Sequence, residues 1–460
     1  MRLHFLCIAG PSRRMAQSQP SLSSFLSPFL RSVRMANSES EVSVIKINEF
    51  ISYSSAYYVE YDKRPCHSGI FNTRKALFVV FDAESEAAKE AKILKELDYH
   101  PAIIRMFCEL KHDDQHFIIL EDHSVRLDTY VHMKEFEISL AVDVIGQVAK
   151  GLEFLHENQI NHGNLGLKAI HLTSLAKSHP RAVIAEFKYA SKVEDGQESK
   201  NGQDVHRLGQ IFHFTLFKET VGIDEVPEYS KGEKSCIEVT AMNAIVAMTG
   251  SWKKPTASAV AKHPLFWSTE KQLRFLIDVS DRVEKLPEDN TFVSGLESDK
   301  GKVFRNWFET LPTPIRDDLV QGPRPYHGST MKDLLRAIRN KKSHFYELTA
   351  NVQTTYGTNK QGYGLFWLNK VPKLLIYVFM KMADCQELSD EYYADDTTPF
   401  SDPKCLTMLD HDKNMKKSNF NSKPYNGPQS ANAAKKQKQK KAKAKMAKRA
   451  EMNTSATDTN

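Results

Sequence analysis

The chain has 460 residues, 41% of them hydrophobic, and it carries 63 basic and 57 acidic residues for a formal net charge of +6. This length predicts two to three domains with a sizeable core, and the near balance of charge argues against nucleic-acid binding over the whole surface. The positive charge is concentrated, because residues 435–449 hold nine basic residues and no acidic one, and leaving those nine out takes the net charge from +6 to −3. We therefore expect the body of the chain to be mildly acidic.

The cysteines and the apolar runs exclude further classes of protein. The six cysteines are scattered and form no C-x-x-C pair, so we expect no disulfide scaffold, no zinc ribbon and no other metal site, and a reducing, cytoplasmic compartment. The sequence contains no stretch of 18 apolar residues, so no membrane span is expected.

The two ends of the chain differ in composition from its body. Residues 1–42 are rich in serine and arginine, and we expect a disordered leader, with a mitochondrial transit segment as the alternative. Residues 396–460 are polar and rich in asparagine and lysine, which predicts a disordered basic tail. RNA tethering, nuclear targeting and an inert solubilising role stay open for its lysine-rich run.

Residues 43–262 alternate strand-like and helix-like patterns, which is typical of an α+β domain. Two short apolar runs, at 76–82 and 117–120, predict strands. Residues 83–97 and 140–156 have apolar residues at helical spacing and predict helices. The buried face expected for the first helix consists of Ala88, Ala91 and Leu94. The buried stripe expected for the second helix consists of Val144, Val148, Leu152 and Leu155.

Four motifs that follow in chain order resemble those of the protein-kinase family. Any one of them alone would be weak, but together they lie at kinase-like spacings, and the resemblance implies a bilobal protein-kinase-like domain over residues 43–262. The motifs are His162–Leu165 at the place of the HRDL catalytic loop, Ile184–Lys188 at the place of DFG, Asp204–Gly209 at the start of a buried helix, and Lys254–Phe266 at the end of the large lobe.

The groups that phosphoryl transfer needs are missing from this region. Residues 51–69, where the glycine-rich loop should lie, contain no GxGxxG, and Ala169 stands at the place of the magnesium-binding asparagine. The resemblance therefore implies an inactive pseudokinase, and the missing glycines and lysine argue against ATP or ADP binding. The degenerate nucleotide pocket has Val79 for the lysine, Glu90 for its helix partner, Asn164 for the catalytic base and Glu186 for the DFG aspartate.

The chain continues past the point where an ordinary kinase ends, into residues 263–395, which are mostly helical by periodicity. Segments of this region resemble the kinase-extension nuclease (KEN) family, to which ribonuclease L and the inositol-requiring sensor of the unfolded-protein response belong. The resemblance implies an α-helical KEN ribonuclease domain over residues 263–395. The segments are residues 263–284, Tyr326, residues 333–346 and residues 366–375.

Residues 332–348 can be placed on a helix at roughly 100° per residue. One face then holds apolar residues and is expected to pack, while the opposite face is expected to present cations, an amide and an imidazole. Metal-free RNA cleavage needs a base for the 2′-hydroxyl, an acid for the 5′-oxygen and donors for the charged phosphorane. A basic helix face is more often simply solvated, so the catalytic interpretation depends on the family resemblance. The residues of the polar face are Arg336, Arg339, Asn340 and His344.

The resemblance implies a role for each of four residues. His344 would be the general acid, Tyr326 the general base or its helper, and Asn340 and Arg339 would hold the scissile phosphate. It also implies an endoribonuclease that cuts single-stranded or loop RNA by 2′-hydroxyl attack, needs no metal or other cofactor, and works as a homodimer. The alternative is a non-catalytic pseudokinase partner that regulates a related kinase–ribonuclease by heterodimerisation.

Overall fold

The computed structural model describes residues 43–409 except for ten gaps, at residues 83, 123–124, 134–135, 174–179, 194–200, 220–233, 251–252, 322–323, 358 and 394–396. The predicted leader and residues 410–460 of the predicted tail lie outside the described residues. Two compact units are present. The described residues of the first are 43–219, 240–267 and 389–405, and those of the second are 234–239, 268–388 and 406–409. The division at Trp267 lies five residues beyond the boundary predicted at 262.

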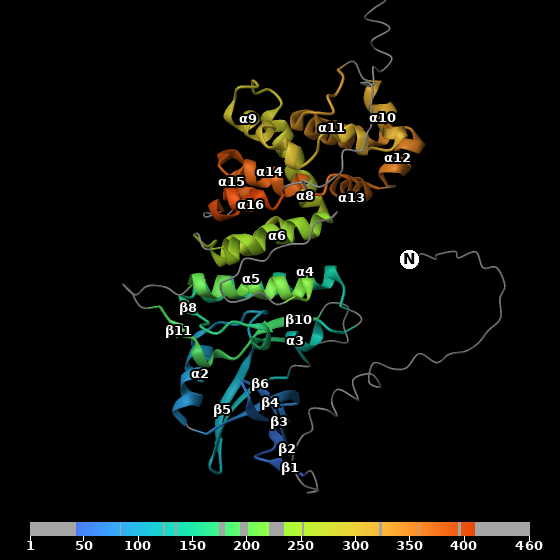
Figure 1. Cartoon of the computed structure of the whole chain (residues 1–460). Helices are drawn as coiled ribbons and strands as arrows, with labels where there is room; N and C mark the ends of the chain where they lie inside the picture. The colour runs from blue at the N-terminus through green and yellow to red at the C-terminus, as the bar shows by residue number, and fades with distance from the viewer. Residues whose placement is uncertain are drawn as a thin grey trace, which may run out of the picture. The chain divides into compact units, whose positions relative to one another are not determined.

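Six antiparallel strands form the main sheet of the first unit, in the order β1-β2-β3-β4-β6-β5 (Figure 1). Residues 76–81 of β4 are all buried, as expected for a strand that is covered on both faces. The strands predicted at 76–82 and 117–120 are confirmed. The six are β1 (Val44–Lys46), β2 (Ile51–Tyr61), β3 (Arg64–Phe71), β4 (Arg74–Phe81), β5 (Met106–His112) and β6 (Gln115–Glu121).

Helix α2 (Glu84–Glu96) confirms the helix predicted beside this sheet, and two of the three residues predicted for its buried face, Ala91 and Leu94, are buried. Ala88 is exposed, and Ala87 is buried in its place. The rotation also turns Glu90 inward, where its carboxylate finds hydrogen-bond partners. The prediction was therefore wrong only at Ala88, because a buried carboxylate, that of Glu90, shares the face with the apolar residues.

Helix α4 (Ile138–Glu157) is the central helix of the rest of the first unit, and all four residues of its predicted apolar stripe are buried. Gly151 allows it to lie close to β10 (Arg181–Ile184), because a Cβ atom at this position would lie 2.9 Å from Ile184 Cδ1. The other elements before Ser268 are β7 (Val125–Arg126), α3 (Leu127–Tyr130), β8 (Ile160–Asn161), η1 (Leu167–Ala169), β9 (Ile170–Thr173), η2 (Phe187–Tyr189), β11 (Ser191–Lys192), α5 (Asn201–Phe217), α6 (Cys236–Thr249), α7 (Ala257–Ala261) and η3 (Pro264–Phe266).

The second unit is built from helices, and no strand is assigned to its described residues. Helix α11 packs against α8, α9 and α13, and residues 374–380 of α14 are all buried (Figure 1). An α+β unit is thus followed by a helical one, in the predicted order. The helices from Ser268 onward are α8 (Thr269–Val283), α9 (Thr291–Ser298), η4 (Lys300–Lys302), η5 (Trp307–Thr310), α10 (Thr313–Val320), α11 (Met331–Ser343), η6 (Phe345–Glu347), α12 (Ala350–Tyr356), α13 (Lys360–Lys370), α14 (Leu374–Lys381), α15 (Gln386–Tyr392), η7 (Thr398–Ser401) and α16 (Pro403–Thr407).

Residues 397–409 correct the prediction that disorder begins at residue 396. This stretch contains η7 and α16, and the Phe400 side chain is fully buried. Asn243 Nδ2 donates a hydrogen bond to the Phe400 carbonyl at 3.1 Å, and the ring centres of His263 and Phe400 lie 4.7 Å apart. The prediction was wrong because it relied on the polar composition of the region, whereas the buried Phe400 has its partners, Asn243 and His263, far upstream in the sequence.

None of the helices among the described residues is both long and apolar enough to cross a membrane.

Candidate functional site

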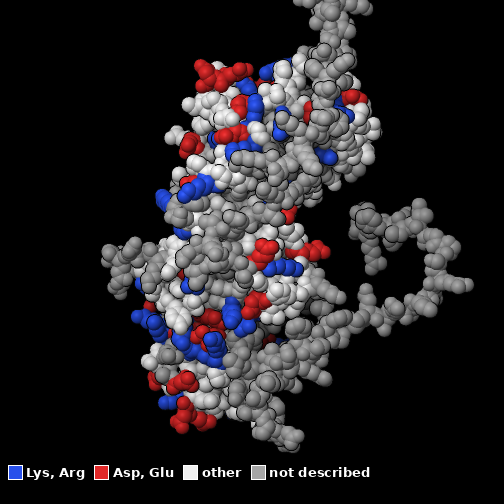
Figure 2. Space-filling view, in the orientation of Figure 1, with Lys and Arg blue, Asp and Glu red and all other residues white. Residues whose placement is uncertain are grey.

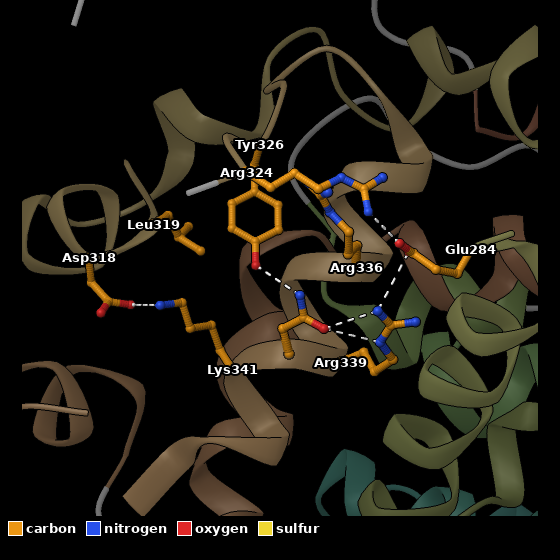
Figure 3. Close-up of a pocket in the computed structure, with 9 residues that line it drawn as sticks. Glu284, Asp318, Leu319, Arg324, Tyr326, Arg336, Arg339 and Lys341 are labelled. Atoms are coloured by element: carbon orange, nitrogen blue, oxygen red, sulfur yellow. Dashed lines mark hydrogen bonds and ion pairs between the residues drawn. The ribbon is translucent and has the colours of Figure 1, made fainter. Parts of the chain in front are cut away.

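A cavity of about 260 Å³ lies in the second unit, lined by residues of α10, of α11 and of the end of α8 (Figure 3). Every residue of its lining except Leu319 carries a polar or charged group. These groups include the phenol of Tyr326 and the amide of Asn340, which are two of the four residues singled out from the sequence. The charged residues of the lining are Arg324, Arg336, Arg339, Lys341, Glu284 and Asp318.

Helix α11 contributes the largest share of this lining. The Thr330 hydroxyl accepts a hydrogen bond from the Asp333 N–H at 3.3 Å and so caps the start of the helix. The apolar face of α11 is buried as predicted. The helix ends at Ser343, five residues earlier than predicted, and η6 follows, in which Phe345 is buried.

Three of the four predicted site residues come together in the cavity. Asn340 Nδ2 donates to the Tyr326 hydroxyl at 3.2 Å. The Asn340 side-chain oxygen accepts from Arg339 Nε and Nη2, both at 3.1 Å. Dashed lines from the Tyr326 phenol and from the Arg339 guanidinium mark these hydrogen bonds in Figure 3. The Asn340 amide therefore holds the Tyr326 phenol and the Arg339 guanidinium close together. A phenol and a cation at this spacing suit the recognition of a phosphate.

Carboxylates hold the cations of the cavity in place. Glu284 lies 2.8 Å from Arg324 and 3.5 Å from Arg339, and Asp318 lies 2.6 Å from Lys341 (Figure 3). Over the face drawn in Figure 2, basic and acidic side chains are likewise interspersed. An anion that enters the cavity therefore has to compete with Glu284 and Asp318 for the cations. Its attraction depends on the positions of these few side chains and not on a surface of one charge.

His344, the fourth predicted residue, is not among the residues that line the cavity. It is the C-cap of α11, its N–H donates to the Asn340 carbonyl at 3.1 Å, and its side chain is 62% exposed. The Nδ1 atom lies 2.9 Å from Glu347 Oε1. The carboxylate at Nδ1 orients the imidazole ring and leaves the Nε2 atom available to a ligand. His344 thus lies one turn beyond Asn340, with its ring held from one side.

Arg336 corrects the predicted polar face of the helix. It was expected to be presented to solvent with Arg339, Asn340 and His344, but only 3% of it is exposed. The reason is that the segment carrying Tyr326 covers it. Sequence reasoning also missed Lys341, Arg324, Glu284 and Asp318, although a helical wheel places Lys341 only 100° from Asn340.

A tyrosine, Tyr61, contacts two of the residues that were predicted to form the degenerate nucleotide pocket of the first unit. The Tyr61 hydroxyl donates to Glu90 Oε1 at 2.6 Å and accepts from the Glu186 N–H at 2.9 Å. The Phe187 N–H also donates to Glu90 Oε1, at 3.0 Å. Glu90 thus has a phenol as its partner where the kinase family has a lysine, and Val79, at the lysine's place, is fully buried. We call Tyr61, Glu90 and Glu186 the tyrosine latch.

The tip of the β2–β3 hairpin takes part in the same contacts. Asp62 and Lys63 form its two-residue turn, with φ values of 47° and 60°, as in the left-handed turns of tight hairpins. The Asp62 N–H donates to Glu186 Oε1 at 3.0 Å. The stretch predicted to lack a glycine-rich loop therefore forms a tight turn that is hydrogen-bonded to the residue at the DFG position.

Burial perturbs the acids of the latch. It raises the pKa of Glu90, even though the hydrogen bond from Tyr61 opposes the shift. Burial also raises the pKa of Glu186, and it raises that of Tyr61 well above its ordinary value. Beside them, burial lowers the pKa of His171 to about 3, so that histidine is neutral at physiological pH.

Asp204 holds the segment that lies at the place of the catalytic loop. Asp204 accepts hydrogen bonds from the His162 N–H at 2.7 Å and the Gly163 N–H at 3.1 Å, and His162 is fully buried. Gly163 has a φ of +76°, and a Cβ there would lie 2.5 Å from the Tyr189 carbonyl oxygen. Asn164 follows, half-buried, with an amide that cannot accept a proton from a hydroxyl substrate.

Comparison with known proteins bears on both units. Residues 272–395 match the family model Ribonuclease 2-5A, and residues 80–208 match the model Protein tyrosine and serine/threonine kinase. A segment that matches the kinase model therefore precedes one that matches the ribonuclease 2-5A model, which confirms the fold class and the resemblance drawn from the motifs.

Three relatives illustrate the extent of the similarity. The chain is 28% identical over 378 residues to the serine/threonine-protein kinase/endoribonuclease ire-1 of Caenorhabditis elegans, covering 72% of this chain and 39% of that protein. It is 29% identical over 356 residues to IRE2 of Homo sapiens, covering 67% and 38%. It is 38% identical over 133 residues to IRE1 of Oryza sativa, covering 29% and 15%. The chain thus spans about two fifths of the length of the first two relatives.

Proposed function

We propose that this chain, which joins a protein-kinase segment to a ribonuclease 2-5A segment as members of the kinase-extension nuclease family do, is an endoribonuclease. The observation that carries the proposal is the contact of Asn340 with both Tyr326 and Arg339 inside a cavity lined by cations. Single-stranded or loop RNA is the proposed substrate, because its phosphates and unpaired bases are accessible to a small cavity on a folded surface.

The proposed reaction is an intramolecular displacement at phosphorus. The 2′-hydroxyl loses its proton to a base that is Tyr326 or is assisted by it, and the 2′-oxygen attacks the adjacent phosphorus. Arg339 and Asn340 hold the phosphate and balance the charge that develops on it. The bond to the 5′-oxygen breaks, and His344 gives that oxygen a proton. The products are a 2′,3′-cyclic phosphate and a 5′-hydroxyl.

We propose that this cleavage needs neither a metal ion nor a nucleotide. The cations of the lining supply positive charge at the phosphate, and histidine supplies a proton near neutral pH. Purified protein should cleave a hairpin RNA in EDTA. His344→Ala and Asn340→Ala should each reduce the rate by about 10²-fold or more, whereas His112→Ala, on β5 of the first unit, should not. Absence of cleavage at any protein concentration, or cleavage unaffected by His344→Ala, would refute the proposal.

We further propose that the kinase-like unit transfers no phosphate and takes up no nucleotide. Val79 and Asn164 remove the lysine and the base, and the tyrosine latch occupies the space between α2 and the DFG position. Millimolar Mg-ATP should leave the melting temperature unchanged, and no labelled phosphate should pass from ATP to the chain or to a test substrate. A rise of several degrees in melting temperature with ATP would contradict this.

Dimerisation through the kinase-like unit is proposed as the means of activation, from the family resemblance. The cleavage rate per chain should then rise with protein concentration in the EDTA assay and level off once dimers dominate. A rate per chain that is independent of concentration would contradict dimer-dependent activity. Binding to a related kinase–ribonuclease without any cleavage would support the regulatory alternative instead.

A further inference from the structure

We propose that Arg336 is a positioning residue that holds Tyr326 in place for the reaction proposed above, and the inference rests on that proposed function. The guanidinium carbon lies 4.4 Å from the centre of the Tyr326 ring. At this distance a cation over the face of an aromatic ring is attracted to it. Arg336 Nη2 also donates to the Pro325 carbonyl at 2.8 Å, so the same side chain holds both the ring and the preceding peptide.

Asp333 holds the other side of the same segment. One of its oxygens lies 3.0 Å from Arg336 Nη2. The other accepts from the His327 N–H at 2.7 Å and lies 2.8 Å from His327 Nδ1. Two side chains one turn apart on α11 therefore bind the peptide groups immediately before and immediately after Tyr326.

The third contact of Tyr326 comes from the next turn of the same helix, where Asn340 Nδ2 donates to the phenol oxygen. One helix thus fixes the two flanking peptides, the ring face and the hydroxyl of Tyr326. Burial of a guanidinium is costly unless it is paired, and Asp333 provides that pairing. The planar guanidinium suits this place, because it can stack on the ring and donate to a carbonyl at once, which an ammonium cannot do.

Arg336→Met tests the proposal, since it removes the guanidinium and keeps an unbranched apolar side chain. A small displacement of a reacting group is expensive in rate, so we expect kcat for the hairpin RNA to fall ~10–100-fold while KM stays nearly constant. In a Tyr326→Phe background the same substitution should have little further effect on kcat. Arg336→Lys retains the charge beside Asp333 and should lie between the wild type and Arg336→Met. Arg274→Met, an exposed arginine on α8, is the matched control and should leave kcat unchanged.

A readout independent of cleavage separates this proposal from the proposed function. In protein carrying ¹³C-labelled tyrosine, the Tyr326 ring resonances, assigned with Tyr326→Phe, should shift or broaden in Arg336→Met and stay in place in Arg274→Met. If the wild type cleaves no RNA, the proposed function fails while the resonances still report whether Arg336 holds the ring. Unchanged resonances, a KM that rises at constant kcat, or an equal loss of kcat in the Tyr326→Phe background would each overturn the positioning role.

Discussion

The Glu284 carboxylate contacts two of the cations in the cavity, because it pairs with Arg324 and Arg339. If the cavity binds an RNA phosphate, as proposed, that phosphate competes with Glu284 for both cations. We expect Glu284→Gln to lower KM about fivefold, equivalent to about 1 kcal/mol, with kcat nearly unchanged, in steady-state cleavage of a short RNA at fixed salt.

A change of charge elsewhere on the same helix is the control for this variant. Asp278, which lies 3.7 Å from Arg274 on α8, does not line the cavity, and Asp278→Asn changes the net charge equally. Its KM should match that of the wild type. A higher KM for Glu284→Gln would mean that the carboxylate is needed to keep Arg339 in position.

Glu90 makes the stability of the first unit depend on pH. Because burial raises its pKa in the folded state, its contribution to stability is complete below the unfolded pKa and is lost as the pH rises through the raised folded pKa. Glu90→Gln keeps an oxygen that can accept from Tyr61 and Phe187 but removes the titrating group. We expect the melting temperature of the variant to fall less than that of the wild type as the pH rises above 4.5.

The comparison for this variant is Glu96→Gln, which removes an exposed carboxylate from the end of the same helix. It should follow the wild-type pH curve. Glu186, whose pKa is also raised by burial, titrates in every one of these proteins. Its contribution therefore cancels in the difference. Parallel curves for Glu90→Gln and wild type would show that Glu90 is ionised at no cost in the folded state.

At the scale of elements, η7 is anchored to the first unit by one aromatic side chain. Phe400 is fully buried against His263, and Asn243 holds its carbonyl. Phe400→Ala should cost about 3–5 kcal/mol of stability, seen as a lower melting temperature and faster hydrogen exchange over residues 397–409. Phe50→Ala, at a side chain that is 56% exposed, should have little effect. Unchanged exchange in Phe400→Ala would contradict the anchoring role.

The elements also show which local structure the sequence could predict. The stripe of α4 was correctly predicted, because four apolar residues repeat at helical spacing and all face one core. The face of α2 was misassigned by one residue, because Glu90 is buried through a partner 29 residues away. Helix α11 was predicted five residues too long, because the apolar spacing continues past Ser343 to Phe345, which is buried in η6. Local periodicity also carries no information on a partner as distant in sequence as that of Glu90.

At the scale of the whole molecule, the nine cations of residues 435–449 lie outside the described residues. Their effect on RNA binding can be tested by measuring how the affinity depends on salt concentration. If they tether RNA, deletion of residues 410–460 should reduce the salt dependence of RNA binding by about 0.7 in the log–log slope for each RNA phosphate that the tail neutralises. The value of kcat should not change. An unaltered slope would exclude tethering and leave nuclear targeting or an inert role.

The order of the two units was predictable from the sequence, whereas much of the detail of the site was not. Kinase and ribonuclease motifs occupy fixed positions along the chain, and they located Tyr326, Arg339 and Asn340, which meet in the cavity. Arg336 was placed on the wrong face, because the segment that covers it comes from outside the helix. Tyr61 carried no signal at all, since its partners lie 29 and 125 residues away.

Three residues that lie close to Tyr61 in the first unit have a left-handed backbone. Asp62, Lys63 and Glu186 all have positive φ, at 47°, 60° and 63°, and they meet where the Asp62 N–H contacts Glu186. At Asp62 and Lys63 such values are usual for a tight hairpin turn. At Glu186 the conformation costs on the order of 1 kcal/mol, and the hydrogen bond from its N–H to the Tyr61 hydroxyl helps to offset that cost. Loss of the hydroxyl would remove this compensation, and the Glu186 backbone would then be able to relax to negative φ.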